Sequence, residues 1–237
     1  MQMIVNLITL LGITALTLTT KRTFTQDELL GVVEPTEHQD FTLVPESLAS
    51  HSTHYLRTEV VEAFVKMAQD AKKEGIHLEV VSAFRSFHRQ KTIWNTKFAR
   101  FKGSDLQRAQ KILEYSSMPG TSRHHWGTDF DLNSVNPAFF DTPQGIQIYI
   151  WLENNAHKYG FFQPYKEFHK HRPTGYREEK WHWSYAPLAD KMLKEYKLRV
   201  KHEDITGFVG SYLAEELNVI ENYVLCIENH NINPKEL

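Results

Sequence analysis

The chain of 237 residues has very little cysteine, and this limits how it can be stabilised. Cys226 is the only cysteine, so no disulfide can form within the chain and the fold cannot depend on one. Any metal site must therefore be built from histidine and carboxylate ligands. Cys226 ends the apolar stretch Val219 to Cys226, and we interpret it as a small packing residue rather than a reactive thiol.

An excess of basic charge is also missing. The sequence has 27 Lys and Arg against 29 Asp and Glu, which gives a formal net charge of -2. Binding to nucleic acid needs a clustered surplus of Lys and Arg to neutralise phosphates, so we expect no nucleic acid partner. Apolar residues make up 41% and charged residues 24%, which are ordinary values for a globular protein with one substantial domain.

A long hydrophobic run occurs only near the start, where Ile4 to Leu18 has no charge and the first charged residue is Lys21. The run is short for a membrane span, which needs about 20 apolar residues. We interpret residues 1–22 as a secretory signal peptide or an uncleaved N-terminal anchor that would tether the chain to a membrane; a buried helix is the alternative. Export would place the single domain, residues 23–237, in the periplasm or cell envelope.

Apolar residues at helical spacing predict several helices. Thr142 and Pro143 form an N-cap and N1 pair, and they open a helix that we expect to pack through Ile146 and Ile150. The segment beyond Pro187 is predicted to be a helical C-terminal cover. The predicted helices before it are Leu56–Ala71, Ser86–Phe98, Leu106–Leu113 and Thr142–Ala156.

Strand patterns alternate irregularly with these helices. Strands are predicted within His77–Phe84, at the end of Ser122–Leu132 after a histidine-rich turn, at Phe161–Phe162 and at Trp181–Tyr185. The segment Thr23–Ser52 is predicted to be extended over the surface. This order lacks a regular βαβ alternation and therefore favours the α+β class.

Three fragments carry the residues suited to chemistry: Ser82–Ser86, Ser122–Asp131 and Glu179–Trp183. A catalytic zinc site takes three protein ligands from His, Asp and Glu and keeps a fourth position for water. The fragments supply histidines, aspartates and a glutamate that can accept a proton. They differ from the helical H-E-x-x-H pattern, so spacing alone leaves the ligand set open.

Taken together, the fragments resemble the signatures of the VanY-type zinc D-Ala-D-Ala carboxypeptidases, in the superfamily that includes lysostaphin and Sonic hedgehog. The family patterns are S-[GA]-[YF]-R-S, S-x-H-x-x-G-x-x-x-D and E-x-W-H. The resemblance covers Val80 to Tyr185. The matching residues are Ser82 to Ser86, then Ser122, His124, Gly127 and Asp131, and finally Glu179, Trp181 and His182.

The resemblance implies a Zn²⁺ ion held by His124, Asp131 and His182, with Glu179 as the general base. It also implies that Arg85 faces the reacting peptide. There its guanidinium could stabilise a growing oxyanion or hold a substrate carboxylate, and the sequence leaves both roles open.

Two further residues, Ser122 and Gln90, occupy positions where family members place groups that contact the substrate or support those that do, although local capping and solvation are the alternative for both. The implied architecture is the hedgehog/D,D-peptidase fold, a small antiparallel sheet flanked by helices. The implied reaction removes the terminal D-alanine from peptidoglycan stem peptides. The alternatives are an L,D-carboxypeptidase, a cell-wall endopeptidase and a non-catalytic zinc-stabilised binding module.

Asp129 departs from the family, where a small apolar residue is common. In a strand it would share a face with Asp131, so it is either a rival ligand or a carboxylate that orients a ligating histidine. Glu179 and His182 are an odd number of residues apart, so a bulge or a late strand start is needed to bring them together.

The remaining histidines, aromatic residues and acidic neighbours are given no catalytic role. The family register selects His124 over His125 and Glu179 over Glu178. The tryptophans near the motifs are equally compatible with walling the site and with packing in the core. Structural roles are expected for His88, His169 and His171, and the tryptophans left open are Trp126, Trp181 and Trp183.

Overall fold

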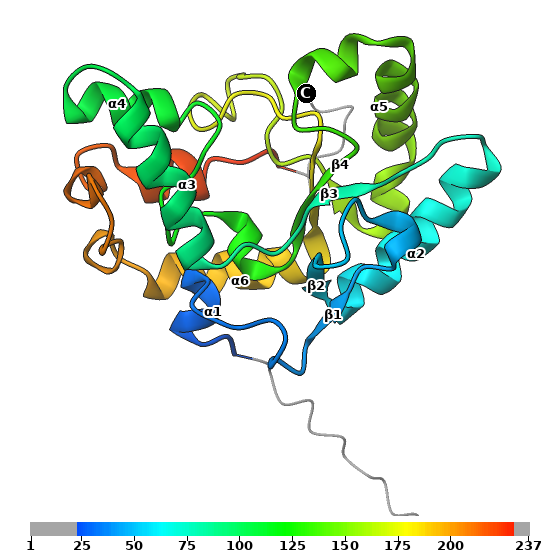
Figure 1. Cartoon of the computed structure of the whole chain (residues 1–237), viewed down its shortest axis with the longest axis horizontal. Helices are drawn as coiled ribbons and strands as arrows, with labels where there is room; N and C mark the ends of the chain where they lie inside the picture. Colours follow the sequence, from blue (N-terminus) through cyan, green and yellow to red (C-terminus); the bar gives the residue numbers. More distant parts are fainter. Residues whose placement is uncertain (1–22, 230–237) are drawn as a thin grey trace, which may run out of the picture.

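The computed structural model describes residues 23–229 of the chain (Figure 1). The predicted signal peptide or anchor, residues 1–22, lies outside the described residues. Between residues 23 and 229, no helix combines the length and the apolar composition that a membrane crossing requires.

A small antiparallel sheet forms the centre of the molecule and confirms the predicted α+β class. Its strand order is β3-β4-β6-β5, and each neighbouring pair is antiparallel. All four predicted strands form, and a register shift between Val80 and Ser82 interrupts the regular pairing of β3 with β4. The bounds are β3 Val80–Ser82, β4 Asp129–Leu132, β5 Phe161–Phe162 and β6 His182–Tyr185.

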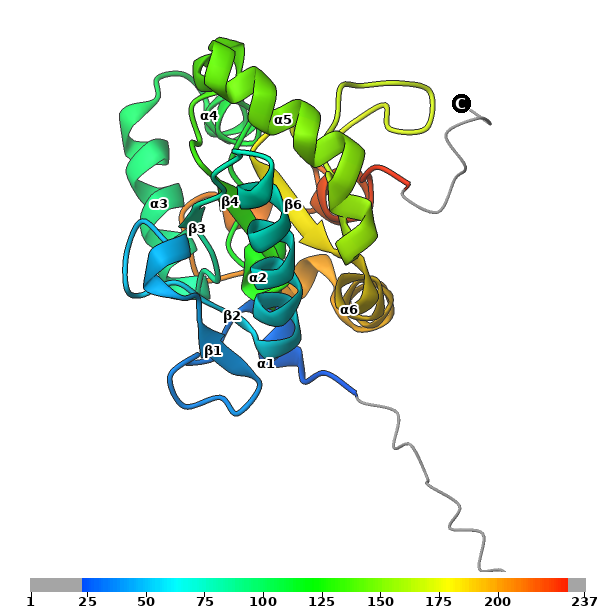
Figure 2. The ribbon, with the colours of Figure 1, turned by 90° about the vertical axis from the view of Figure 1, so that its right-hand side faces the viewer.

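Helices flank this sheet (Figures 1 and 2). In Figure 1, α2 and α5 lie to the right of β3 and β4, α3 and α4 lie to the left, and α6 runs below. Each predicted helix forms within a few residues of its expected ends. The bounds are α2 Thr58–Lys73, α3 Phe87–Arg100, α4 Asp105–Ile112, α5 Pro143–Asn155 and α6 Ala186–Arg199.

The hydrophobic core covers one face of the sheet. The ring of Phe130 on β4 lies 5.1 Å from that of Phe64 on α2 and 5.2 Å from that of Phe161 on β5. Because side chains alternate along a strand, the neighbours Asp129 and Asp131 point to the opposite face. The core therefore determines which face of the sheet is left for polar groups.

The segment Thr23–Ser52 is more structured than predicted. It contains helix α1, Gln26–Leu30, and strand β1, Phe41–Leu43, which pairs with β2, Tyr55–Arg57. A capping box starts α1: the Thr25 hydroxyl accepts the backbone N–H of Glu28, whose carboxylate accepts the N–H of Thr25. The sequence contains this T-x-x-E signal, so the prediction of a purely extended segment was wrong.

Two other predictions also differ from the structure. Ile146 and Ile150 on α5 are exposed at 44% and 53%, whereas Ile148 is buried. Trp151 and Ala156 of the same apolar pattern are buried. This helix is apolar around most of its circumference, so periodicity identified only part of the buried face. Beyond Arg199, the expected helical cover consists of short 3₁₀ turns and one π-helical turn, Ile220–Val224, although its apolar residues are buried as predicted.

Candidate functional site

The three predicted ligands come from two adjacent strands and the turn before them. Pairing of β4 with β6 places Asp131 directly opposite His182. His124 lies on the 3₁₀ turn η2, Arg123–Trp126, which precedes β4. Gly127 ends this turn with φ 68°, and a Cβ there would lie 2.4 Å from the Phe41 ring, so the turn requires glycine.

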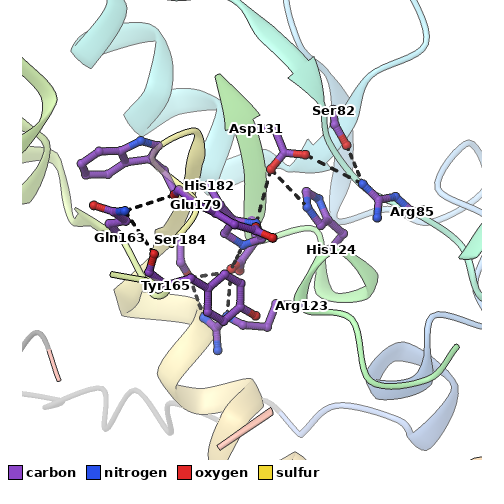
Figure 3. A network of polar contacts seen from close by, with 12 residues as sticks. Ser82, Arg85, Arg123, His124, Asp131, Gln163, Tyr165, Glu179, His182 and Ser184 are labelled. Atoms are coloured by element: carbon purple, nitrogen blue, oxygen red, sulfur yellow. Dashed lines mark hydrogen bonds and ion pairs between the residues drawn. The ribbon is translucent and has the colours of Figure 1, made fainter. Parts of the chain in front are cut away.

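Free donor atoms of these residues converge (Figure 3). Asp131 Oδ1 lies 3.4 Å from His124 Nε2 and 3.3 Å from His182 Nδ1. The three donor atoms all lie within 4.8 Å of one another, and all three residues are buried. Asp131 Oδ1 has no hydrogen-bond partner among the described residues. A buried carboxylate oxygen without a donor, facing two imidazole nitrogens, fits a cation site.

The second nitrogen of each histidine is engaged elsewhere, which orients the ring. His124 Nδ1 lies 2.9 Å from the carbonyl oxygen of Ala83, and His182 Nε2 lies 3.0 Å from Asp129 Oδ2. Such contacts set which nitrogen is left to bind a metal. Both remaining nitrogens, Nε2 of His124 and Nδ1 of His182, face Asp131.

The charges of this cluster also favour a cation. Burial raises the pKa of Asp131, but the neighbouring histidines outweigh burial and hold this pKa well below its usual range. Burial lowers the pKa of His182, but the carboxylates of Asp129, Asp131 and Glu179, which lie 3.0 to 3.3 Å from its ring nitrogens, outweigh burial and raise this pKa well above its ordinary value. Several buried carboxylates thus surround the His182 imidazole. A divalent cation would neutralise their negative charge, as a proton on His182 does in its absence.

Asp129 lies behind His182 rather than among the converging donor atoms. Its Oδ2 accepts a hydrogen bond from Arg123 Nε at 2.8 Å, and its Oδ1 accepts bonds from Thr128 Oγ1 at 2.6 Å and Ser184 Oγ at 3.0 Å. Both carboxylate oxygens are therefore used. This geometry favours the orienting role for Asp129 over the role of rival ligand.

Glu179 lies next to the convergent donors. Its Oε2 is 3.3 Å from His182 Nδ1, and burial raises the pKa of its carboxyl group. The His182 N–H donates to the Glu179 carbonyl at 3.1 Å, which closes a turn just before β6 begins. This late strand start is one of the two solutions predicted for the odd spacing.

Arg85 follows β3 and lines the same cavity. It donates to Gln90 Oε1 at 3.0 Å and to Ser82 Oγ at 2.9 Å, and its Nη2 lies 3.8 Å from Asp131 Oδ2. Of the two positions expected for Gln90, the structure favours the one behind a substrate-contacting group, because Gln90 is completely buried outside the cavity lining and donates to the Ser117 carbonyl at 2.7 Å. Its contacts hold Arg85 in place.

A cavity of about 430 Å³ unites these groups. Ser122 lines it, as predicted, and makes no side-chain capping bond. Several lining residues lie outside the family patterns and carried no signal in the sequence. These additional residues include Lys97, Ser116, Arg123, Tyr165 and Tyr176.

His125 and Glu178, the neighbours that the family patterns do not select, point away from the proposed metal-ligand atoms. His125 is buried with Nδ1 at 2.5 Å from the Arg85 carbonyl oxygen and Nε2 accepting the Gly120 N–H, and burial lowers its pKa to about 3. Glu178 lines a separate groove. Of the tryptophans, Trp181 lines the cavity, whereas Trp126 and Trp183 belong to the core.

A second group of possible ligands, Glu28, His38 and Asp40, lies beneath β2. Here the buried guanidinium of Arg57 already pairs with Glu28 at 2.9 Å and with Asp40 at 3.5 Å. Protein cations thus neutralise these carboxylates. This contrast singles out the cluster around Asp131 as the candidate metal centre.

Comparisons with known proteins agree on one family. Residues 53–188 match the family described as VanY, D-alanyl-D-alanine carboxypeptidase. The chain is 34% identical to the Bacillus subtilis (strain 168) protein YodJ over 161 residues, which cover 62% of the chain and 55% of YodJ. It is 30% identical to a D-alanyl-D-alanine carboxypeptidase of Enterococcus faecium over 169 residues, which cover 71% of this chain and 48% of the relative. The chain thus spans about half the length of these relatives.

Among solved structures, the LdcB LD-carboxypeptidase is similar over 84% of this chain and 81% of its own, with 26% identity and a TM-score of 0.53. This similarity agrees with the hedgehog/D,D-peptidase fold that the sequence resemblance implied.

Proposed function

The chain belongs to the VanY family of D-alanyl-D-alanine carboxypeptidases, and on this premise we propose that it is a zinc-dependent carboxypeptidase that removes the terminal D-alanine from peptidoglycan stem peptides. One observation carries the proposal: Glu179 Oε2 lies 3.3 Å from His182 Nδ1, beside the convergent donors of His124 and Asp131. A metal-ligand set with an adjacent carboxylate is the arrangement that hydrolysis of a peptide bond requires.

We propose that His124, Asp131 and His182 hold zinc, which when bound would polarise the scissile carbonyl and acidify a water molecule. Glu179 takes the proton of the attacking water on its carboxylate and passes it to the leaving amine. Its buried position and raised pKa suit a group that must hold this proton between the two steps.

In this proposal, Arg85 donates hydrogen bonds to the oxygen of the scissile carbonyl as negative charge develops on it. Support comes from its position: Ser82 and Gln90 hold the guanidinium, which lies 3.8 Å from the ligand Asp131. Gln90 then acts on the substrate only through Arg85, and Ser122 contributes to the cavity wall. Tyr165, whose ring lies 4.8 Å from that of His182, helps to exclude bulk water.

The proposed substrate lies outside the cytoplasm, so the proposal includes export directed by residues 1–22 and a periplasmic or cell-envelope location. The similarity to the LdcB LD-carboxypeptidase favours a second candidate, removal of the terminal residue from tetrapeptides rather than pentapeptides. Both reactions use the same metal centre and base. They differ in the residues that precede the scissile bond.

Digestion of purified muropeptides followed by mass spectrometry tests these proposals. Loss of one alanine from pentapeptides is expected, in a reaction that a zinc chelator abolishes and added zinc restores. Loss of alanine from tetrapeptides alone would identify the L,D-carboxypeptidase, and internal cleavage would identify an endopeptidase. Bound zinc without hydrolysis of any muropeptide would contradict the enzyme and indicate a binding module.

A further inference from the structure

A second cation, Lys97 on α3, lines the same cavity as Arg85. Lys97 is half-buried, and its Nζ donates to Ser116 Oγ at 2.5 Å. No carboxylate among residues 23–229 forms an ion pair with it, whereas Arg85 lies 3.8 Å from Asp131 Oδ2. Withdrawing an ammonium group from water without a counter-charge is unfavourable. Because no carboxylate of the described residues pairs with Lys97, its ammonium group is suited to bind an anionic ligand.

A second buried polar group, the Tyr176 hydroxyl, lines the same cavity. Tyr176 is 2% exposed, and although its hydroxyl interacts with Ser117 and Thr121, it makes no hydrogen bond of ordinary geometry with the described residues. Ser117, beside Ser116 in the segment after α4, also lines the cavity. Buried hydroxyl groups nearly always have hydrogen-bond partners. An ammonium group and a buried hydroxyl that line one cavity can together bind a carboxylate.

Arg85 forms an ion pair with a predicted metal ligand, Asp131, whereas Lys97 contacts none of the three ligands in the described structure. Lys97 forms no ion pair with Asp131 or Glu179 among the described contacts, although Arg85 and Glu179 both act on it electrostatically: burial and Arg85 lower the pKa of its ammonium group, and Glu179 raises it. In a peptide that loses one terminal residue, the free carboxylate lies one residue beyond the scissile carbonyl. Arg85, which is paired with a predicted metal ligand, therefore suits the scissile carbonyl, and Lys97, which is not, suits the free carboxylate.

We propose that Lys97, supported by Ser116 and Tyr176, binds the free α-carboxylate of the substrate's terminal residue and leaves Arg85 to the scissile carbonyl. This inference rests on the proposed function and extends it. It separates the two roles that the sequence left open for Arg85. It also limits the enzyme to peptides with a free C-terminus, because an internal peptide bond offers Lys97 no negative charge.

The test compares two pentapeptides that end in D-Ala-D-Ala, one with a free carboxylate and one with a C-terminal amide. For the wild type, we expect kcat/KM to favour the free acid by about 10- to 100-fold, the size of a hydrogen bond to a charged group. Lys97→Met should bring this ratio close to one, and Lys97→Arg should restore most of it. Lys91→Met, on the same helix but outside the cavity lining, is the matched control and should keep the wild-type ratio.

Calorimetric titration of both peptides into the zinc-loaded proteins tests carboxylate binding by Lys97 without turnover. Ser116→Ala gives a second, milder variant, which should weaken binding of the acid severalfold and reduce the preference over the amide. Equal acid-over-amide ratios in the wild type and Lys97→Met, in binding and in turnover, would overturn the inference. If the wild type binds the acid through Lys97 but cleaves neither peptide, the role of Lys97 in binding the carboxylate is supported and the proposed hydrolytic function is contradicted.

Discussion

The carboxylate of Asp129 lies between His182 and Arg123, with Oδ2 at 3.0 Å from His182 Nε2 and 2.8 Å from Arg123 Nε. All three side chains are buried. Arg123 also donates to Ser184 Oγ at 2.6 Å, so it is anchored to the sheet as well. Asp129 thereby orients the His182 ring, and Arg123 compensates the negative charge that Asp129 brings into the interior.

Replacing Asp129 with Asn is therefore expected to weaken zinc binding. The variant loses the negative charge that orients His182 and raises its basicity, and outer carboxylates of this kind contribute about 10- to 100-fold to metal affinity. Competition with a chromophoric chelator measures the change, and Asp141→Asn, at an exposed position, serves as the control. Wild-type zinc affinity in Asp129→Asn would show that Asp129 has no role in orienting the ligand.

Glu179→Gln should retain zinc and lose hydrolysis. The amide cannot accept the proton of the attacking water, and general base catalysis typically contributes about 10²- to 10⁴-fold to the rate. Zinc content and turnover on a D-Ala-D-Ala peptide are measured on the same samples. Glu178→Gln provides the matched control, because Glu178 is adjacent in sequence but lines another groove. Undiminished turnover by Glu179→Gln would remove Glu179 from the role of base.

His124→Ala and His182→Ala should each abolish tight zinc binding. Each variant leaves only two of the three converging donors, and a catalytic zinc site needs three protein ligands. Metal analysis after dialysis gives the zinc content of each protein. His88→Ala, which removes an exposed histidine, should keep the wild-type content. Zinc retained by both ligand variants would place the metal elsewhere.

The ion pair between Glu28 and Arg57 should make stability depend on pH. Burial raises the pKa of Glu28, but hydrogen bonds from Thr25 and Arg57 outweigh burial and lower this pKa in the folded state. A lowered folded-state pKa stabilises the protein above the unfolded-state value of about 4.3 and loses this effect as pH falls through the folded-state pKa.

Glu28→Gln is expected to reduce the free energy of unfolding at pH 7 by about 1–3 kcal/mol, since a charge-assisted hydrogen bond is weakened. The difference from the wild type should shrink as pH falls below about 4.3, where Glu28 is protonated in the unfolded chain while it is still ionised in the folded state, and this ionic contribution is gone once pH is below the folded-state pKa. Urea unfolding at several pH values measures both effects. A difference that stays constant from pH 7 to pH 3 would contradict the ionic contribution of Glu28.

Local patterns in the sequence were sufficient where one element determines a residue's surroundings. Helix α2 follows from its apolar spacing, and its predicted core residues are buried. The alternation of β4 places Asp129 and Asp131 on one face, as predicted. The same reasoning failed in part on α5, because a helix that is apolar on most sides has no single periodic face, and Ile146 is exposed.

The sequence by itself determined the candidate ligands, because His124, Asp131 and His182 occupy the positions that the VanY-type patterns mark. Tertiary structure alone decided that Asp129 turns to Arg123, that Gln90 holds Arg85, and that Lys97 enters the cavity. The physical reason is that hydrogen-bond partners and burial depend on which distant segments pack together. Periodicity describes only one segment at a time.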